Sequence, residues 1–195
     1  MPAVIALLRA VNVGGRNNVR MEEVRTLFAA LGCKNVQTYL QSGNVVFNTS
    51  KPSPSQVAAE LQTAINEALG IETIIIPRTP ADLRATISNN PFAEGIANGT
   101  IDPSKLMVAY FQSRPSDDVC EKAARRGLES SKQSGKQPDE IRFHGREAYI
   151  YYPNGLGKAT FNWSAFERGS KIPATARNWT TTLKLLELSE ALPSL

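Results

Sequence analysis

Polar side chains gather at the positions where the apolar strands of the sequence end. Three such groups stand out: Arg9, Asn12, Gly14, Gly15, Arg16, Asn17 and Asn18; Gln41, Ser42, Gly43 and Asn44; and Arg177 with Asn178. Arginine, asparagine and glutamine donate hydrogen bonds to oxygen atoms, and they are poorly suited to proton transfer. The groups therefore predict recognition of a ligand rather than catalysis by these residues alone.

Glycine and lysine add two candidate anion contacts. Gly14-Gly15 stands between a predicted strand and a predicted helix, where backbone N–H groups approach phosphate oxygens, although paired glycines also serve simple turns. The segment 155–160 is similar to a nucleotide-binding phosphate loop, but Tyr152 and Ala159 stand where that motif requires glycine and Ser or Thr. The mismatch argues against a nucleotide hydrolase and leaves Lys158 as a candidate anion contact.

Arg177 and Asn178 precede an amphipathic stretch that predicts a helix. Asn178 is a good helix cap. Together with Arg177, the same helix terminus would also receive a carboxylate or phosphate. Both roles remain open from the sequence.

Familiar catalytic patterns are missing from the sequence. His144 is the only histidine and has no nucleophile motif around it. An enzyme acting on a phosphorylated metabolite would need a general base such as Tyr39 or Glu94, so enzymatic activity is left undecided. No ligand pattern for a metal is present, and we expect no metal and no cofactor.

The charge balance favours an anionic partner. The 195-residue chain has a net charge of +4 and a pI of about 9.2, with basic excess in residues 1–20 and 158–184. A solvated basic surface is the alternative. No apolar run is long enough for a membrane helix or a signal peptide, so we expect a cytoplasmic protein without membrane contact. Cys33 and Cys120 are expected to be buried thiols.

Periodicity in the first half predicts a βαββαβ order. Strands are expected at 4–8, 36–40, 45–47 and 71–76, and helices at 21–31 and 54–69. This order is that of a split βαβ, ferredoxin-like unit. The RNA-binding module of that fold stacks bases on aromatic residues of its central strands, whereas residues 4–8 are aliphatic. That face is expected to be covered by the second half.

The second half is predicted to begin the same order again and to end in a helix. Strands are expected at 106–111, 140–143 and 148–152, helices at 117–128, 160–168 and 178–192, and a loop at 130–138. The predicted organisation is a ferredoxin-like domain at 1–78, a linker with a short helix at 79–103, and a second α+β domain at 104–195. The fold class is therefore α+β with two ferredoxin-like-related halves, the second βαββα plus a C-terminal helix.

Four sequence blocks resemble a known bacterial family. They are residues 8–15 with Asn17 and Val19, residues 38–47, Asn90-Pro91-Phe92 and residues 174–179. The chain is identified by them as similar to the domain-of-unknown-function family numbered 1697, with Ala10 where many relatives have glycine. The resemblance implies an α+β fold with two ferredoxin-like-related halves, and it implies no activity, cofactor or catalytic residue.

The leading hypothesis is an anionic small ligand, bearing a phosphate or carboxylate, held between the two halves. Its expected contacts are Arg9, Asn12, Gly14, Gly15, Asn17, Gln41, Ser42, Asn44, Lys158, Arg177 and Asn178. A competing hypothesis is that the same amides and arginines are internal scaffolding that satisfies backbone groups. Nucleic-acid binding through the basic loops is a third. The oligomeric state is not predicted.

Overall fold

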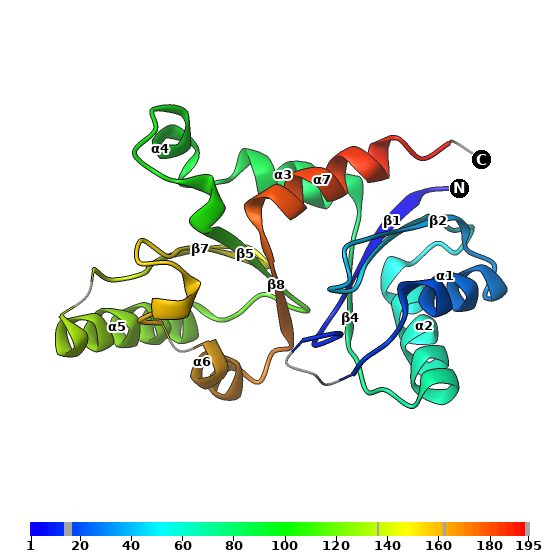
Figure 1. Ribbon diagram of the computed structural model, residues 1–195, viewed down its shortest axis with the longest axis horizontal. Helices are drawn as coiled ribbons and strands as arrows, with labels where there is room; N and C mark the ends of the chain where they lie inside the picture. Colours follow the sequence, from blue (N-terminus) through cyan, green and yellow to red (C-terminus); the bar gives the residue numbers. More distant parts are fainter. Residues whose placement is uncertain (14–16, 136, 162, 194–195) are drawn as a thin grey trace. The chain divides into compact units, whose positions relative to one another are not determined.

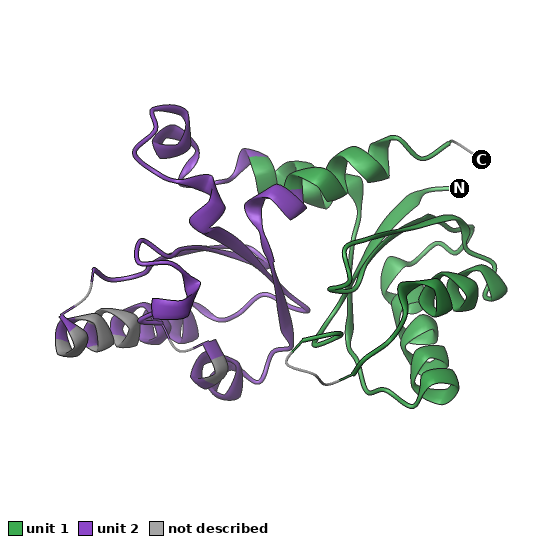
Figure 2. Cartoon of the chain, viewed as in Figure 1, with its two compact units in different colours: residues 1–87, 183–195 green, residues 88–182 purple. Residues whose placement is uncertain are grey.

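The computed structural model of the chain describes residues 1–13, 17–135, 137–161 and 163–193 (Figure 1). The chain divides into two compact units, coloured separately in Figure 2. Unit 1 comprises Met1–Ile87 with Leu183–Leu195, and unit 2 comprises Ser88–Thr182. The predicted linker, 79–103, is therefore divided between the two units, and so is the C-terminal helix.

Unit 1 is built on a four-stranded antiparallel sheet in the order β2-β3-β1-β4. Its elements are β1 (Ala3–Leu8), α1 (Met21–Ala30), β2 (Lys34–Tyr39), β3 (Asn44–Asn48), α2 (Pro54–Leu69), β4 (Ile75–Arg78) and α3 (Pro80–Ser88, which extends one residue into unit 2). Figure 1 shows α1 and α2 together on one face of this sheet. The strand and helix order is that of a ferredoxin-like fold.

The core of unit 1 follows from the alternation of side chains along β1. Val4, Ala6 and Leu8 belong to the buried cluster that α1 and α2 cover, and Phe28 meets Phe47 there at a centroid distance of 5.3 Å. The helices begin and end as the sequence predicts. Ser53 caps α2 by accepting a hydrogen bond from the Gln56 N–H at 3.3 Å, and Gly70 ends it with a φ of 63°.

Unit 2 repeats this topology with the strand order β6-β7-β5-β8. Its elements are α4 (Ala93–Ala97), η1 (Pro103–Lys105), β5 (Leu106–Phe111), α5 (Asp117–Ser134), β6 (Glu140–His144), β7 (Glu147–Tyr151), η2 (Leu156–Lys158), α6 (Trp163–Ser170) and β8 (Ala174–Asn178), followed by α7 (Trp179–Glu190), whose first turn belongs to this unit. Aromatic rings fill its core. Phe111, Trp163 and Phe166 lie within 6.0 Å of one another between ring centroids.

The two sheets have the same register. Ile5 of β1 pairs with Arg78 of β4, and Val108 of β5 pairs with Arg177 of β8. Ile5 and Val108 are each the third residue of the first strand in their unit. Arg78 and Arg177 therefore occupy equivalent positions, and both are buried. They lie on the face of each sheet that alternation turns away from the helix-covered core.

The α+β class with two ferredoxin-like-related halves is confirmed, with three corrections in detail. The second half does not lack its last strand, because residues 174–178 form β8. The strand expected at 71–76 is Ile75–Arg78 and runs through Pro77. The segment expected as a loop from residue 130 is helical up to Ser134, and α5 ends at Gly135, which has a φ of 64°.

Candidate functional site

Five of the predicted site residues that the structure describes lie in two neighbouring loops of unit 1, and a sixth, Asn44, is the first residue of β3 directly after them. We call residues 9–20 the β1–α1 loop and residues 40–43 the β2–β3 turn. They meet where the Leu8 N–H donates to the Gly43 carbonyl at 2.8 Å. A Cβ on Gly43 would stand 2.7 Å from the Cβ of Leu8, and its φ is 76°. Only glycine fits there without displacement of its neighbours, so the turn lies directly against the end of β1.

Asn12 holds the two loops together. Its Nδ2 donates to the carbonyl oxygens of Val19 at 2.9 Å and Gln41 at 2.8 Å, and its Oδ1 accepts from the Val19 N–H at 2.8 Å. One side chain thus joins both ends of the β1–α1 loop to the β2–β3 turn. These bonds are of the kind expected from the scaffolding hypothesis.

Asn17 and Asn44 also bond to the backbone. Asn17 Nδ2 donates to the carbonyl oxygens of Ala10 at 3.1 Å and Glu72 at 3.2 Å. Asn44, which is fully buried, donates through Nδ2 to the Tyr39 carbonyl at 2.8 Å and to Ser42 Oγ at 3.2 Å. The asparagine side chains therefore fix the backbone conformation of the loops. Other groups form the surface that the loops expose.

Arg9 and Gln41 differ from each other in how far their side chains are exposed. The Arg9 side chain is half-buried, and its backbone is fixed by bonds to the Ile74 carbonyl at 2.9 Å and from the Thr73 hydroxyl at 2.8 Å. The Gln41 side chain is exposed. Gly14 and Gly15 lie outside the described residues. Arg9 thus places a permanent positive charge at the base of a loop whose sequence contains no carboxylate from residue 9 to residue 20.

The backbone of these two loops is strained. Ala10, Asn12 and Asn17 in the β1–α1 loop have φ values of 55°, 53° and 49°, and Leu40 in the β2–β3 turn has a φ of 58°. Asparagine tolerates this left-handed conformation, but for alanine and leucine it is unfavourable. Strained residues of this kind cluster at binding and catalytic sites.

The remaining three predicted site residues belong to unit 2. Lys158 is exposed on η2. Asn178 Oδ1 accepts from the Thr181 N–H at 2.7 Å, so it forms the predicted cap of α7. Arg177 is buried and donates through one guanidinium nitrogen to Thr175 Oγ1 at 2.7 Å and to the Ala176 carbonyl at 2.8 Å. Burial lowers the pKa of Arg177 to about 10, with Tyr110 acting in the opposite direction.

Two polar residues with structural importance are not evident from the sequence. Arg78 is almost fully buried and donates to the Pro77 carbonyl at 2.9 Å. Asp139 is buried and accepts at Oδ2 from the N–H groups of Thr160 at 2.6 Å and Phe161 at 2.8 Å. Neither lies in a local motif. The equivalence of Arg78 to Arg177 is recognised only when the registers of the two sheets are compared.

Among the described residues, two cysteines and two tyrosines also have pKa values that burial raises. Burial raises the pKa of the Cys33 and Cys120 thiols, which favours the unreactive protonated form. Cys33 is buried as predicted, and Cys120 is half-buried. Burial also raises the pKa values of Tyr149 and Tyr152. Within the described part of the chain, no three histidine, cysteine, aspartate or glutamate side chains are grouped to hold a metal ion.

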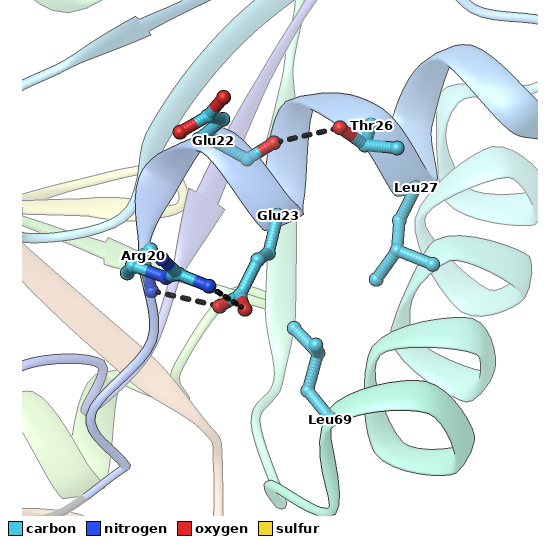
Figure 3. A pocket seen from close by; sticks show the side chains of 6 residues that line it. All are labelled: Arg20, Glu22, Glu23, Thr26, Leu27 and Leu69. Atoms are coloured by element: carbon cyan, nitrogen blue, oxygen red, sulfur yellow. Dashed lines mark hydrogen bonds and ion pairs between the residues drawn. The ribbon is translucent and has the colours of Figure 1, made fainter.

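A shallow pocket of about 420 Å³ lies at the start of α1, next to the end of the β1–α1 loop (Figure 3). Its lining residues are Arg20, Glu22, Glu23, Thr26, Leu27 and Leu69. Glu23 accepts from the Arg20 guanidinium at 3.0 Å and from the Arg20 N–H at 3.3 Å. Because this arginine is already paired and two carboxylates are present, the pocket is a poor anion site.

Fold and site together define an α+β protein of two ferredoxin-like units, in which the irregular, polar loops of unit 1 form the candidate site. The chain belongs to the family described as protein of unknown function (DUF1697), whose profile matches residues 1–149. The block at 174–179 lies beyond the matched residues.

A solved structure with a similar fold is that of the conserved bacterial protein SP0830 from Streptococcus pneumoniae. The TM-score is 0.64 at 21% sequence identity, with 96% of this chain and 98% of that chain covered. At this identity the likeness concerns the fold alone. The comparison with curated proteins gives no match. None of the helices in the described ranges has the length and apolar character needed to cross a membrane.

Proposed function

We propose that the β1–α1 loop and the β2–β3 turn of unit 1 bind a small anionic ligand bearing a phosphate or carboxylate. The observation that carries this proposal is the concentration of left-handed, non-glycine residues in these two loops, at Ala10, Asn12, Asn17 and Leu40. Such strain costs stability and is maintained only where the surroundings enforce it. Here the side chains of Asn12 and Asn17 enforce it.

In this proposal the amides and the arginine have different tasks. Asn12, Asn17 and Asn44 preorganise the backbone, so that little conformational entropy is lost when a ligand binds. Arg9 supplies the charge, and the exposed Gln41 amide lies in the neighbouring β2–β3 turn. The scaffolding and binding hypotheses are then compatible, since the scaffold is what presents the site.

The experiment is calorimetric and thermal-shift titration with inorganic phosphate, pyrophosphate and citrate, using wild type, Arg9→Gln and Arg20→Gln. Both substitutions remove one positive charge, and the Arg20 side chain is 80% exposed and paired with Glu23. Loss of a charge-assisted hydrogen bond reduces affinity about tenfold to a hundredfold. We expect this loss for Arg9→Gln and little change for Arg20→Gln. Absence of saturable binding, or an equal loss in both variants, contradicts the proposal.

Nucleic-acid binding is the second candidate, favoured by the basic excess at 1–20 and 158–184. It predicts that the logarithm of the affinity for oligonucleotides falls linearly and steeply with the logarithm of the salt concentration. Titration of a fluorescent single-stranded oligomer at several salt concentrations tests it. Binding that is salt-dependent and equally weakened by Arg9→Gln and Arg20→Gln would favour this reading over the small ligand.

A further inference from the structure

Two exposed aliphatic side chains stand on the candidate site. Val13 in the β1–α1 loop is 61% exposed and Leu40 in the β2–β3 turn is 54% exposed. Single exposed aliphatic residues are common and need no explanation. Here two of them lie on adjoining loops, and one of these loops also carries Arg9.

The hydrogen bond between Asn12 and Gln41 links the two chain segments that carry these residues. Val13 follows Asn12 in the chain and Leu40 precedes Gln41, and Asn12 Nδ2 lies 2.8 Å from the Gln41 carbonyl oxygen. Each aliphatic residue is therefore the direct chain neighbour of one partner in this bond. A Cβ on Gly43 would stand 2.7 Å from the Leu8 Cβ, so the turn lies directly against the end of β1.

Leu40 is unfavourable for folding in two respects. Its φ of 58° is the left-handed conformation, in which a leucine Cβ crowds the following carbonyl and glycine or asparagine is preferred. Its side chain is also mostly in water, so it contributes little burial of apolar surface. Folding therefore gives no reason for leucine at this position, whereas an apolar contact with a ligand does.

We propose that the ligand of this site is amphiphilic, an anion carrying an aliphatic or aromatic group that packs on Val13 and Leu40. This inference rests on the proposed anion-binding function and names the chemical class of its ligand. The anionic end is placed by Arg9 and the apolar end by the two side chains. A hydrophilic anion such as inorganic phosphate would use only half of this surface.

The test is a calorimetric titration with methyl, butyl and hexyl phosphate. Each methylene group that is fully buried increases affinity about fourfold. We expect affinity to rise with chain length for the wild type, and the rise to be lost in Leu40→Gly and Val13→Ser. Leu156→Ser is the matched control, because Leu156 is 60% exposed on η2 of unit 2. It should leave the chain-length dependence unchanged.

Leu40→Gly also separates binding from folding. Glycine accepts the left-handed conformation, so the melting temperature of this variant should be equal to or above that of the wild type. A stable Leu40→Gly protein with no chain-length dependence is the expected result. Equal affinity of the wild type for methyl and hexyl phosphate overturns the inference, as does a chain-length dependence that both variants retain or that Leu156→Ser abolishes.

The outcome for Arg9 distinguishes this inference from the proposed function. If methyl phosphate binds in an Arg9-dependent manner and chain length has no effect, the anion site stands and the amphiphilic ligand is wrong. If hexyl phosphate binds through Val13 and Leu40 with no effect of Arg9→Gln, the apolar surface stands and the anion site is wrong. If no alkyl phosphate binds, and phosphate, pyrophosphate and citrate do not bind either, both are wrong.

Discussion

The two units share one topology and differ in the loops that leave it. In unit 1 the first strand and first helix are joined by residues 9–20, whereas in unit 2 residues 112–116 make the same connection. The hairpin turn is 40–43 in unit 1 and 145–146 in unit 2. Among the described residues, left-handed non-glycine positions number five in unit 1 and one, Lys171, in unit 2. The two units therefore share a fold, but these loops are long and strained in unit 1 and shorter and less strained in unit 2.

The faces opposite the helices differ as well. In unit 1 this face carries Ile5, Leu7, Val46 and Ile76 around Arg78, and in unit 2 it carries Val108, Tyr110, Tyr149 and Thr175 around Arg177. Three of these four aliphatic side chains in unit 1 are replaced by hydroxyl-bearing ones in unit 2, and Ile5 corresponds to Val108. The equivalent arginines are therefore buried in chemically different surroundings.

The largest difference between the units is expected for glycine substitutions in the two hairpin turns. Gly43→Ala combines left-handed strain with a contact of 2.7 Å to Leu8, and we expect it to cost about 2 to 5 kcal/mol. At Gly145 the φ is 59° and the nearest atom to an added Cβ, Glu147 Oε2, lies at 3.9 Å. Gly145→Ala should therefore cost only about 1 kcal/mol.

Urea unfolding followed by tryptophan fluorescence and circular dichroism measures both free energies. Hydrogen exchange then assigns each loss to its unit. The comparison of the loops is contradicted if the two substitutions cost the same, because the close approach at Gly43 would then contribute nothing.

The sequence predicted the topology of unit 1 better than the edges of its elements. β4 begins late because Thr73 and Ile74, which look like strand residues, bond instead to the Arg9 backbone. It runs through Pro77 because β4 lies at an edge of its sheet, where a missing N–H is tolerated. The strand β8, Ala-Thr-Ala-Arg-Asn, was missed because its buried positions include threonine and arginine, which period-two alternation does not mark as core.

The candidate site was predictable as a group of residues but not in its arrangement. Asparagines at the ends of strands indicate turns and polar contacts, so Asn12, Asn17 and Asn44 could be selected by type. Their bonds join residues up to 55 positions apart, as between Asn17 and Glu72, and no local pattern encodes such a pairing. The left-handed conformation of Leu40 could not be predicted either, since leucine rarely adopts it.

The second prediction concerns stability at alkaline pH. It tests how the sheet face opposite the helices differs between unit 1 and unit 2. Burial raises the pKa of the Tyr149 hydroxyl, with smaller contributions from Glu147 and Tyr110. The unfolded chain loses this proton near pH 10, before the folded chain does, so the stabilising contribution is complete below about pH 10 and is lost as pH rises further. Each such group changes stability by at most about 1.4 kcal/mol per pH unit.

Tyr149→Phe should therefore make the free energy of unfolding fall less steeply between pH 10 and 11.5. Arg177 acts in the opposite sense in the same range, because its folded pKa of about 10 lies below the ordinary value of 12.5 and the unfolded chain then holds more protons. Urea unfolding of the wild type and Tyr149→Phe at pH 8, 10 and 11 measures the slopes. Parallel slopes would show that the tyrosine is not protected from ionisation in the folded protein.

The smallest expected effect is at two of the side-chain caps, Ser53 in unit 1 and Asn178 in unit 2. Asn178→Ala removes the 2.7 Å bond to the Thr181 N–H and should cost about 1 kcal/mol. Ser53→Ala in unit 1 removes a longer bond of 3.3 Å to the Gln56 N–H and should cost less. Urea unfolding of both variants measures the difference, and a larger loss for Ser53→Ala would contradict the ranking.

Asn178→Asp distinguishes a cap from an anion receptor. Aspartate accepts the same bond and its charge is favourable at a helix N-terminus, so stability should be retained or slightly raised. The same charge repels an anionic ligand. If Asn178 only caps α7, phosphate affinity is unchanged in this variant, and unit 2 contributes structure while unit 1 carries the site. Weaker phosphate binding with full stability would instead make Asn178 a ligand contact and remove the functional contrast between the units.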